Sequence, residues 1–314
     1  MRFVFCGTPS FAVPTLKAVL RAGHEAALVV TQPDRRSGRG MQMVAPPVKE
    51  AALAAGLTVV QPEKIKNNLE FRLQLEALAP DVILVVAYGR IIPRWMLDLP
   101  RLGNINLHGS LLPRYRGAAP IQWAGANGEA VTGVTTMRID EGLDTGDMLL
   151  QREMAIAPDQ TSEDLYPLLA EMGASLMVET LEGLASNSIA PRKQDDSLAT
   201  HAPILTRDDG RMDFAQPAMT LYNRWRGFQP WPGAWTMLGG KKLIAHRLMP
   251  FEAGSLASVD VATGELQIEQ ERLFVACGAQ SWLEIAELQI EGKKRMAASE
   301  FLRGHALHSG DRLG

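Results

Sequence analysis

Three polar residues of this sequence have types and a spacing that suit chemistry at a carbonyl carbon. Asn106 and His108 are two positions apart, so their side chains share one face if they lie on a β-strand. An asparagine amide and an imidazole can both donate to a developing oxyanion. Asp144 lies in a glycine-bracketed loop, where its carboxylate could orient His108, favour its charged form or accept a proton through water. Because this set contains no serine or cysteine nucleophile, it suits direct acyl transfer to an incoming amine.

The spacing by itself leaves a structural interpretation open, because each of these residue types is common. Asn106 could cap a turn, His108 could pack in a core and Asp144 could form a surface Asx turn. Other motifs are weak. No Gly-x-Gly-x-x-Gly follows the first expected strand, so a dinucleotide cofactor is not indicated. No metal site is predicted, since His305 and His308 have no cysteine or acidic cluster near them.

Strand and helix signals alternate in the first half of the chain and must position these side chains. Helical patterns separate strand-like runs at 2–6, 26–30, 57–60, 81–87, 104–108 and 134–139. Such runs predict a parallel sheet covered on both faces, which is the doubly wound, Rossmann-like α/β fold. Asn106 and His108 fall at the carboxyl end of their strand, where open α/β sheets bind ligands.

The second half has a different character. After residue 207 we expect one helix at 218–228, then short strands at 234–238, 242–248, 264–270, 273–277 and 283–290. Short strands at this spacing predict a small β-barrel. The chain has 314 residues, more than one small core needs. We therefore predict a catalytic domain at 1–189, a polar linker at 190–206 and a C-terminal domain at 207–314.

Composition favours a water-soluble globular protein. Hydrophobic residues make up 46% of the chain and charged residues 21%, with a net charge of −3. The longest strongly apolar run, residues 82–88, is far shorter than a membrane span, and the N-terminus does not have the build of a signal peptide. Cys6 and Cys277 lie in apolar contexts, which favours two buried thiols in a reducing cytoplasm.

The run from His108 to Gly117, His-Gly-Ser-Leu-Leu-Pro-Arg-Tyr-Arg-Gly, resembles the signature of the folate-dependent formyltransferases. The resemblance covers nearly the whole chain, because it continues at residues 5–9, 31–40, 142–147, 230–232 and 292–294. It implies a Rossmann-like formyltransferase domain followed by a small OB-like barrel. It also implies that Asn106, His108 and Asp144 are catalytic.

Within that family the chain is most similar to the enzymes that formylate methionyl-tRNA for translation initiation. This resemblance implies 10-formyltetrahydrofolate as the cosubstrate and the α-amino group of methionine on initiator methionyl-tRNA as the acceptor. It further implies a cytoplasmic monomer. Formylation of a sugar nucleotide and hydrolysis of formyltetrahydrofolate are the alternative activities, and a non-catalytic RNA-binding protein of the same fold is a third. The intact set of Asn106, His108 and Asp144 argues against that third alternative.

The resemblance also implies positions for the two ligands. The tetrahydrofolate pocket is expected to be formed by Ser110, Leu111, Leu112, Pro113, Arg90, Ile92 and Asp140. Residues 32–49 carry four basic side chains against one acid, which suits contacts with RNA phosphates. This loop departs from many relatives at Met41 and Gln42, where they often have lysines. The expected tRNA-binding residues are Arg35, Arg36, Arg39, Lys293 and Lys294.

Overall fold

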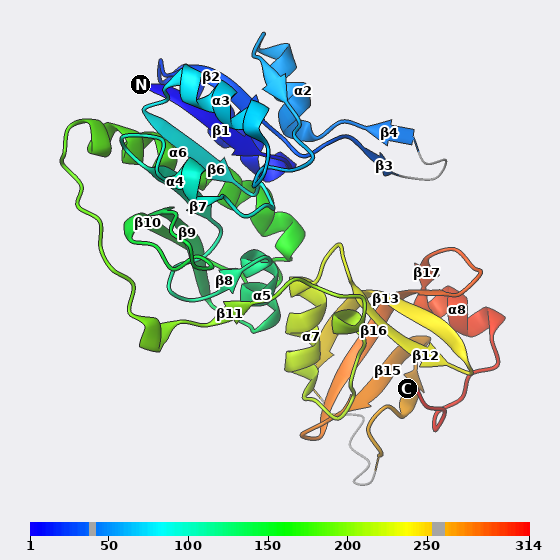
Figure 1. The fold of residues 1–314 in the computed structure, drawn as a ribbon. Coiled ribbons are helices and arrows are strands. Elements are labelled where there is room, and N and C mark those ends of the chain that lie inside the picture. The colour runs from blue at the N-terminus through cyan, green and yellow to red at the C-terminus, as the bar shows by residue number, and fades with distance from the viewer. Residues whose placement is uncertain (38–41, 253–260) are drawn as a thin grey trace. The chain divides into compact units, whose positions relative to one another are not determined.

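The computed structural model describes residues 1–37, 42–252 and 261–314, and these form two compact units (Figure 1). The first unit contains Met1–Pro120, Val131–Ala155 and Asp164–Pro203. The second contains Ile121–Ala130, Ile156–Glu163 and Ile204–Gly314. The domain limits expected from the sequence, with a linker at 190–206, stay a prediction.

A seven-stranded sheet forms the centre of the first unit, in the order β10-β9-β7-β6-β1-β2-β5 within the described residues. Five neighbouring strands are parallel, and the sheet continues with β9, which is antiparallel to β7, and with β10, which is antiparallel to β9. This arrangement confirms the Rossmann-like prediction. The strands are β1 (Arg2–Gly7), β2 (Glu25–Val30), β5 (Val59–Val60), β6 (Val82–Val86), β7 (Asn104–His108), β9 (Val131–Arg138) and β10 (Met148–Ala155).

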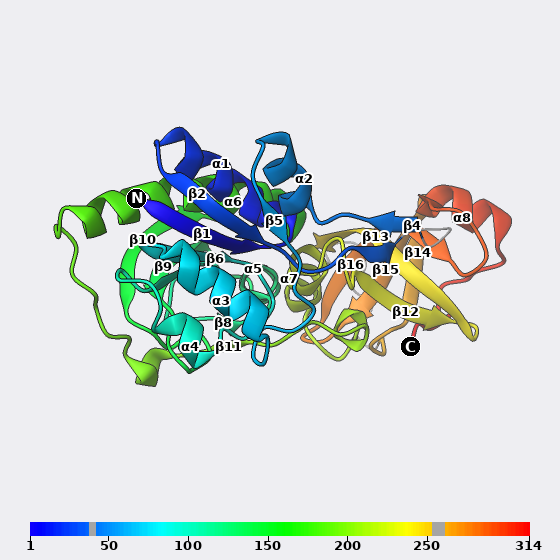
Figure 2. The same ribbon diagram turned by 45° about the horizontal axis from the view of Figure 1, so that its top comes forward.

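Helices cover both faces of this sheet, α3 and α4 on one face and α1 and α6 on the other (Figure 2). Burial on both faces explains why β6 reads as an unbroken apolar run, Val-Ile-Leu-Val-Val. The helices are α1 (Val13–Arg21), α2 (Pro47–Ala54), α3 (Leu69–Leu78), α4 (Arg94–Leu97) and α6 (Ser162–Ala185), with a 3-10 turn η1 (Ser10–Ala12) before α1.

Strand β7 divides its side chains between the two faces. Leu107 points toward α6, where it lies so close to Gly173 that a Cβ there would be 2.5 Å from Leu107 Cδ2. Strand periodicity therefore turns Asn106 and His108 to the opposite face. On that same face, Nδ2 of Asn104 donates to the carbonyl oxygens of Met96 and Leu97, both at 3.0 Å. The sheet thus presents three polar side chains, those of Asn104, Asn106 and His108, beside an apolar core.

Two small strand pairs complete the first unit. Strand β3 (Arg35–Ser37) pairs with β4 (Gln42–Val44) in antiparallel orientation. Strand β8 (Arg116–Gly117) pairs in parallel with β11 (His201–Ala202), close after the 3-10 turn η2 (Asp196–Leu198). The second pair joins segments about 85 residues apart in sequence, and one of them lies in the expected linker.

The second unit is an antiparallel sheet in the order β12-β13-β16-β15-β14 within the described residues, with β17 paired to β16. This confirms the predicted C-terminal β domain. Leu243, Leu283, Ile285 and Phe301 are fully buried at its centre. The elements are the 3-10 turn η3 (Asp208–Gly210), α7 (Ala218–Gly227), β12 (Ala234–Leu238), β13 (Lys241–Phe251), β14 (Leu266–Glu269), β15 (Arg272–Cys277), β16 (Ser281–Ile290), β17 (Met296–Ala297) and α8 (Ala298–Gly304).

Two segments from the middle of the chain pack onto α7 in the second unit. Helix α5 (Pro120–Ala126) approaches its end so closely that a Cβ on Gly227 would lie 2.1 Å from the backbone nitrogen of Ala126. Ser162 Oγ donates to the carbonyl oxygen of Gly227 at 2.6 Å. Glycine is required at 227 because two backbones meet there.

Candidate active site

Asn106 and His108 lie at the carboxyl end of β7, on the face that α6 does not cover. Asn106 is half-buried and His108 is 5% exposed. The Nε2 atom of His108 is 2.9 Å from the carbonyl oxygen of Tyr115. Because a carbonyl oxygen can only accept, Nε2 carries the hydrogen of this bond. The other ring nitrogen, Nδ1, is therefore the one that can take up a proton.

Asp144 completes the group from the loop that follows β9. Its Oδ2 atom lies 3.7 Å from His108 Nδ1 and accepts a hydrogen bond from the backbone nitrogen of Gly117 at 2.9 Å. The backbone of Asp144 is left-handed, with φ of 53°. That conformation costs roughly 1–2 kcal/mol for most L-residues, although aspartate visits it more readily. Surrounding contacts must therefore hold the loop in this shape.

These three side chains provide an amide donor, an imidazole and a carboxylate around one face of β7. The amide can bind an oxyanion, and the imidazole with its carboxylate can move a proton. Across the described residues there is no group of three or more His, Cys, Asp and Glu side chains placed to hold a metal. The arrangement of these side chains is suited to acyl transfer to an amine.

The loop that follows β7 contains four of the predicted folate-binding residues. Ser110 is buried and its hydroxyl donates to the carbonyl oxygen of Arg114 at 2.6 Å, so it shapes the loop. Leu112 packs against Met137 and Met148. Leu111 and Pro113 are half-buried, and they have the surface that a ligand could contact.

Arg90, Ile92 and Asp140 lie on neighbouring loops. The guanidinium of Arg90 donates to the carbonyl oxygen of Glu63. Ile92 is 8% exposed and packs within the core of the first unit, so the backbone of its loop is what a ligand could meet. Asp140 is exposed, and it accepts hydrogen bonds from Gly142 N at 3.0 Å and from the hydroxyl of Thr145 at 2.7 Å. Asp140 therefore braces the loop that carries Asp144.

The predicted tRNA-binding residues are distributed over both units. Arg35 and Arg36 are exposed on β3, and Arg39 lies outside the described residues. Lys293 and Lys294 are exposed on the turn between β16 and β17.

Lys49 belongs to the same basic stretch but is engaged by an acid. Its Nζ atom is 2.7 Å from Oδ2 of Asp34. Hydrogen bonds from Lys49 and Gln61 hold the pKa of the Asp34 carboxyl below its ordinary value. Among the described residues of 32–49, the positive charge that is not paired with Asp34 therefore belongs to Arg35 and Arg36.

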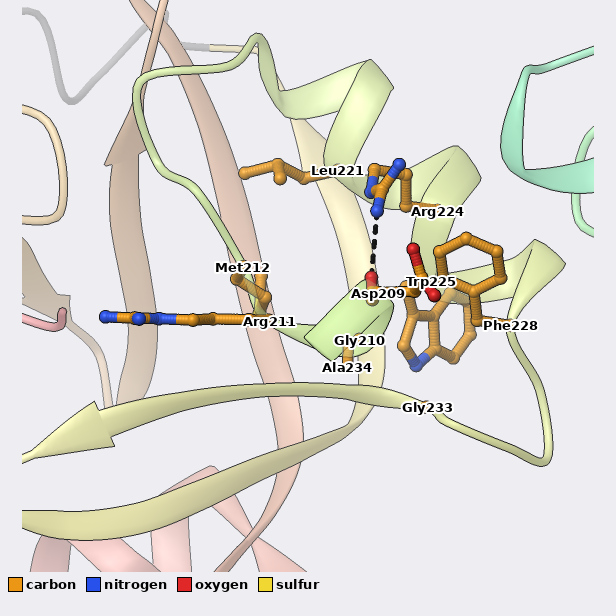
Figure 3. Close-up of a pocket in the computed structure, with 10 residues that line it drawn as sticks. All are labelled: Asp209, Gly210, Arg211, Met212, Leu221, Arg224, Trp225, Phe228, Gly233 and Ala234. Atoms are coloured by element: carbon orange, nitrogen blue, oxygen red, sulfur yellow. Dashed lines mark hydrogen bonds between the residues drawn. The ribbon is translucent and has the colours of Figure 1, made fainter. Parts of the chain in front are cut away.

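Two hollows differ strongly in size. One, of about 340 Å³, opens at the carboxyl ends of β1, β2 and β6, and is lined by Thr8, Pro9, Gln32, Pro33, Arg35, Val44, Ala45, Pro46, Ala87, Tyr88 and Gly89. The other lies in the second unit beside Trp225 and Phe228, where Arg224 donates to the carbonyl oxygen of Asp209 at 2.8 Å (Figure 3). Its volume of about 10 Å³ is too small for a folate or a nucleotide.

Sequence reasoning missed the residues that hold the loops of the site. Thr135 Oγ1 donates to the carbonyl oxygen of Ser110 at 2.6 Å, and Tyr115 N donates to Thr200 Oγ1 at 2.8 Å. Gln194 contacts the Asp144 loop. The polar composition around Gln194 indicated a linker, and no local pattern pointed to these distant partners.

Comparison with protein families identifies the family to which this chain belongs. A model described as "Formyl transferase" matches residues 1–181, and one described as "Formyl transferase, C-terminal domain" matches residues 204–306. The chain belongs to the formyl transferase family. The first match contains Asn106, His108 and Asp144, and the second covers most of the antiparallel β domain.

Relatives of this formyl transferase share its full length. The methionyl-tRNA formyltransferase of Acidobacterium capsulatum is 70% identical over 100% of both chains, and that of Koribacter versatilis is 60% identical over 100% of this chain and 99% of its own. Solved structures with the same fold include WlaRD, a sugar 3N-formyl transferase, with a TM-score of 0.66 and 18% identity over 94% and 99% of the chains. The N-formyltransferase from Helicobacter canadensis has a TM-score of 0.64 and 17% identity over 90% and 98%.

None of the helices in residues 1–37, 42–252 and 261–314 has the length and apolar character that a membrane span requires.

Proposed function

We propose that this formyl transferase moves the formyl group of 10-formyltetrahydrofolate to the α-amino group of methionine on initiator methionyl-tRNA. The observation that carries the proposal is the placement of Asp144 Oδ2 at 3.7 Å from His108 Nδ1, beside Asn106 on the same strand face. The acceptor is inferred from relatives at 60% and 70% identity over the full chain, which are named methionyl-tRNA formyltransferase. Sugar-acting neighbours share the fold at 17–18% identity.

The chemistry follows from the roles that the three side chains can take. The amine attacks the formyl carbon, and the carbonyl oxygen becomes an oxyanion that Asn106 stabilises by donating from its amide. A proton must leave the attacking nitrogen, and one must reach the departing nitrogen of tetrahydrofolate. His108 relays protons through Nδ1, because its Nε2 hydrogen is fixed on the Tyr115 carbonyl. Asp144 supports the imidazolium that forms.

The folate has candidate contacts in the first unit, and the tRNA has candidate contacts in both units. The folate is proposed to bind against the 110–113 loop, with Arg90, Ile92 and Asp140 on the loops beside it. The larger hollow extends along the carboxyl ends of the strands and has Arg35 among its lining residues, which suits the acceptor end of an RNA. Exposed Arg35, Arg36, Lys293 and Lys294 supply positive charge for phosphate contacts, as we propose for Arg39.

A competition among acceptors tests the function. The purified protein is incubated with 10-formyltetrahydrofolate and one of three acceptors: charged initiator methionyl-tRNA, charged elongator methionyl-tRNA or a 4-amino sugar nucleotide. We expect formylmethionyl-tRNA from the initiator substrate, measured as acid-stable formyl label on the tRNA. Product from the sugar nucleotide alone, or free formate alone, would overturn the proposal.

The arginines of β3 provide a second prediction. Replacing Arg35 and Arg36 together by alanine should raise KM for tRNA about tenfold and lower the slope of log KM against log salt by about 1–2, because phosphate contacts are lost. The KM for the folate should stay within about twofold. Arg21→Ala is the matched control, since this exposed arginine ends α1 just before β2 begins, whereas β3 follows the carboxyl end of β2. An unchanged salt slope in the double variant would remove β3 from the RNA interface.

A further inference from the structure

Gln194, in the segment between α6 and β11, makes four hydrogen bonds within the first unit. Its Nε2 atom donates to the carbonyl oxygens of Asp144 at 2.8 Å and of Gly146 at 2.7 Å. Its Oε1 atom accepts from Nε of Arg116 at 3.0 Å and from Nη2 at 2.8 Å. One amide therefore uses both of its hydrogens and both of its lone pairs.

The partners of Gln194 are the elements that orient the catalytic group. The Asp144 and Gly146 carbonyls lie on either side of Thr145, so the two bonds fix the turn in which Asp144 is left-handed. Arg116 is 5% exposed and directly precedes Gly117, whose nitrogen donates to Asp144 Oδ2. Gln194 thus holds the backbone of Asp144 and, through Arg116, the strand that holds its carboxylate.

The same segment has a second attachment nearer β11. Thr200 Oγ1 accepts from the nitrogen of Tyr115 at 2.8 Å, and the Thr200 carbonyl accepts from Arg116 N at 2.8 Å. Tyr115 supplies the carbonyl that binds His108 Nε2. Residues 194 and 200 therefore anchor the partners of both Asp144 and His108.

We infer that Gln194 is a positioning residue for formyl transfer, acting through Asp144. The inference rests on the proposed function, because formyl transfer is the reaction in which Asp144 is proposed to act. A side chain at 194 must donate twice to the Asp144 loop and accept twice from Arg116. A glutamate keeps the shape and the two acceptor bonds, but it cannot donate and would place oxygen atoms against two carbonyl oxygens.

Gln194→Glu therefore removes the two bonds to the Asp144 loop and keeps the two bonds from Arg116. We expect kcat for formylation to fall about 10- to 100-fold, because displacements of about 1 Å at a reacting group can cost on the order of 10²-fold. The KM for each substrate should stay within about twofold, and the folate-binding stoichiometry should be unchanged. Asp196→Asn is the matched control: Asp196 is exposed and ion-paired to Arg116 at 2.7 Å, but makes no bond to the Asp144 loop among those described. The kcat of the Asp196→Asn variant should equal that of the wild type.

A double-mutant cycle with Asp144→Asn identifies the route of the effect. If Gln194 acts through Asp144, the Gln194→Glu change should lower kcat little further once Asp144 is replaced. Gln194→Met, which keeps the length but forms no hydrogen bonds, carries the same test if the glutamate variant does not fold. Unchanged kcat, or losses that multiply in the double variant, would overturn the inference. The wild-type rate in the same assay reports on the proposed function, so the two can fail separately.

Discussion

Replacing Asn106 by alanine should lower the single-turnover rate of formyl transfer about 10²- to 10³-fold, the usual cost of removing one oxyanion donor. Asn106 lies half-buried on the same face of β7 as His108. The loss should appear in kcat with little change in folate affinity, because the donor acts on charge that develops in the transition state. The measurement is quenched-flow formylation with enzyme in excess over charged tRNA.

Asn104→Ala is the matched control on the same strand. Asn104 is 2% exposed and donates to the carbonyls of Met96 and Leu97, so its loss should cost about 1–3 kcal/mol of unfolding free energy. Its rate per folded molecule should stay near that of the wild type. A near-normal single-turnover rate for the Asn106 variant would show that the oxyanion is bound by another group.

Replacing Asp144 by asparagine should lower kcat about 10²- to 10⁴-fold, the range that positioned acid–base groups contribute. The amide oxygen can still accept from Gly117 N, so the loop keeps its shape while the charge beside His108 Nδ1 is removed. Steady-state kinetics with both substrates saturating, together with a thermal unfolding curve, measure the two effects separately.

The control for Asp144 is another carboxylate of the same loop. Glu141 is exposed and forms an ion pair with Arg94 at 3.2 Å, the kind of surface pair that contributes little to stability. Glu141→Gln should leave kcat and the unfolding midpoint unchanged. Equal losses in the two variants would mean that loop charge in general, and not the carboxylate facing His108, governs the rate.

The strand that carries the site could be predicted from short-range pattern alone. The run 104–108 has a period of two, which places Asn106 and His108 on one face, and the structure confirms β7 as Asn104–His108. The element order likewise predicted a doubly wound sheet and a C-terminal β domain. In contrast, β10 and the pairs β3–β4 and β8–β11 were not predicted. The latter pair is short, and its strands are brought together by contacts remote in sequence.

The segment at 190–206 makes contacts that its local composition does not reveal. Its polar composition is typical of a linker, but residues 192–202 bond to β10, to the Asp144 loop and to β8. Gln194 reaches partners 50 and 78 residues away, and Thr200 bonds Tyr115 across 85 residues. A polar side chain that satisfies distant backbone groups has the same local signature as one exposed to solvent.

The sequence by itself predicted which side chains we propose to react, and it determined the strand face that two of them share and the overall order of elements. These follow from residue type and from periods of two and 3.6, which are local properties of the chain. The tertiary structure decided how Asp144 meets His108, because that distance depends on a loop after an antiparallel strand and on a glutamine 50 residues away. Contacts of this kind arise only when the closed core brings remote backbone groups within hydrogen-bonding distance.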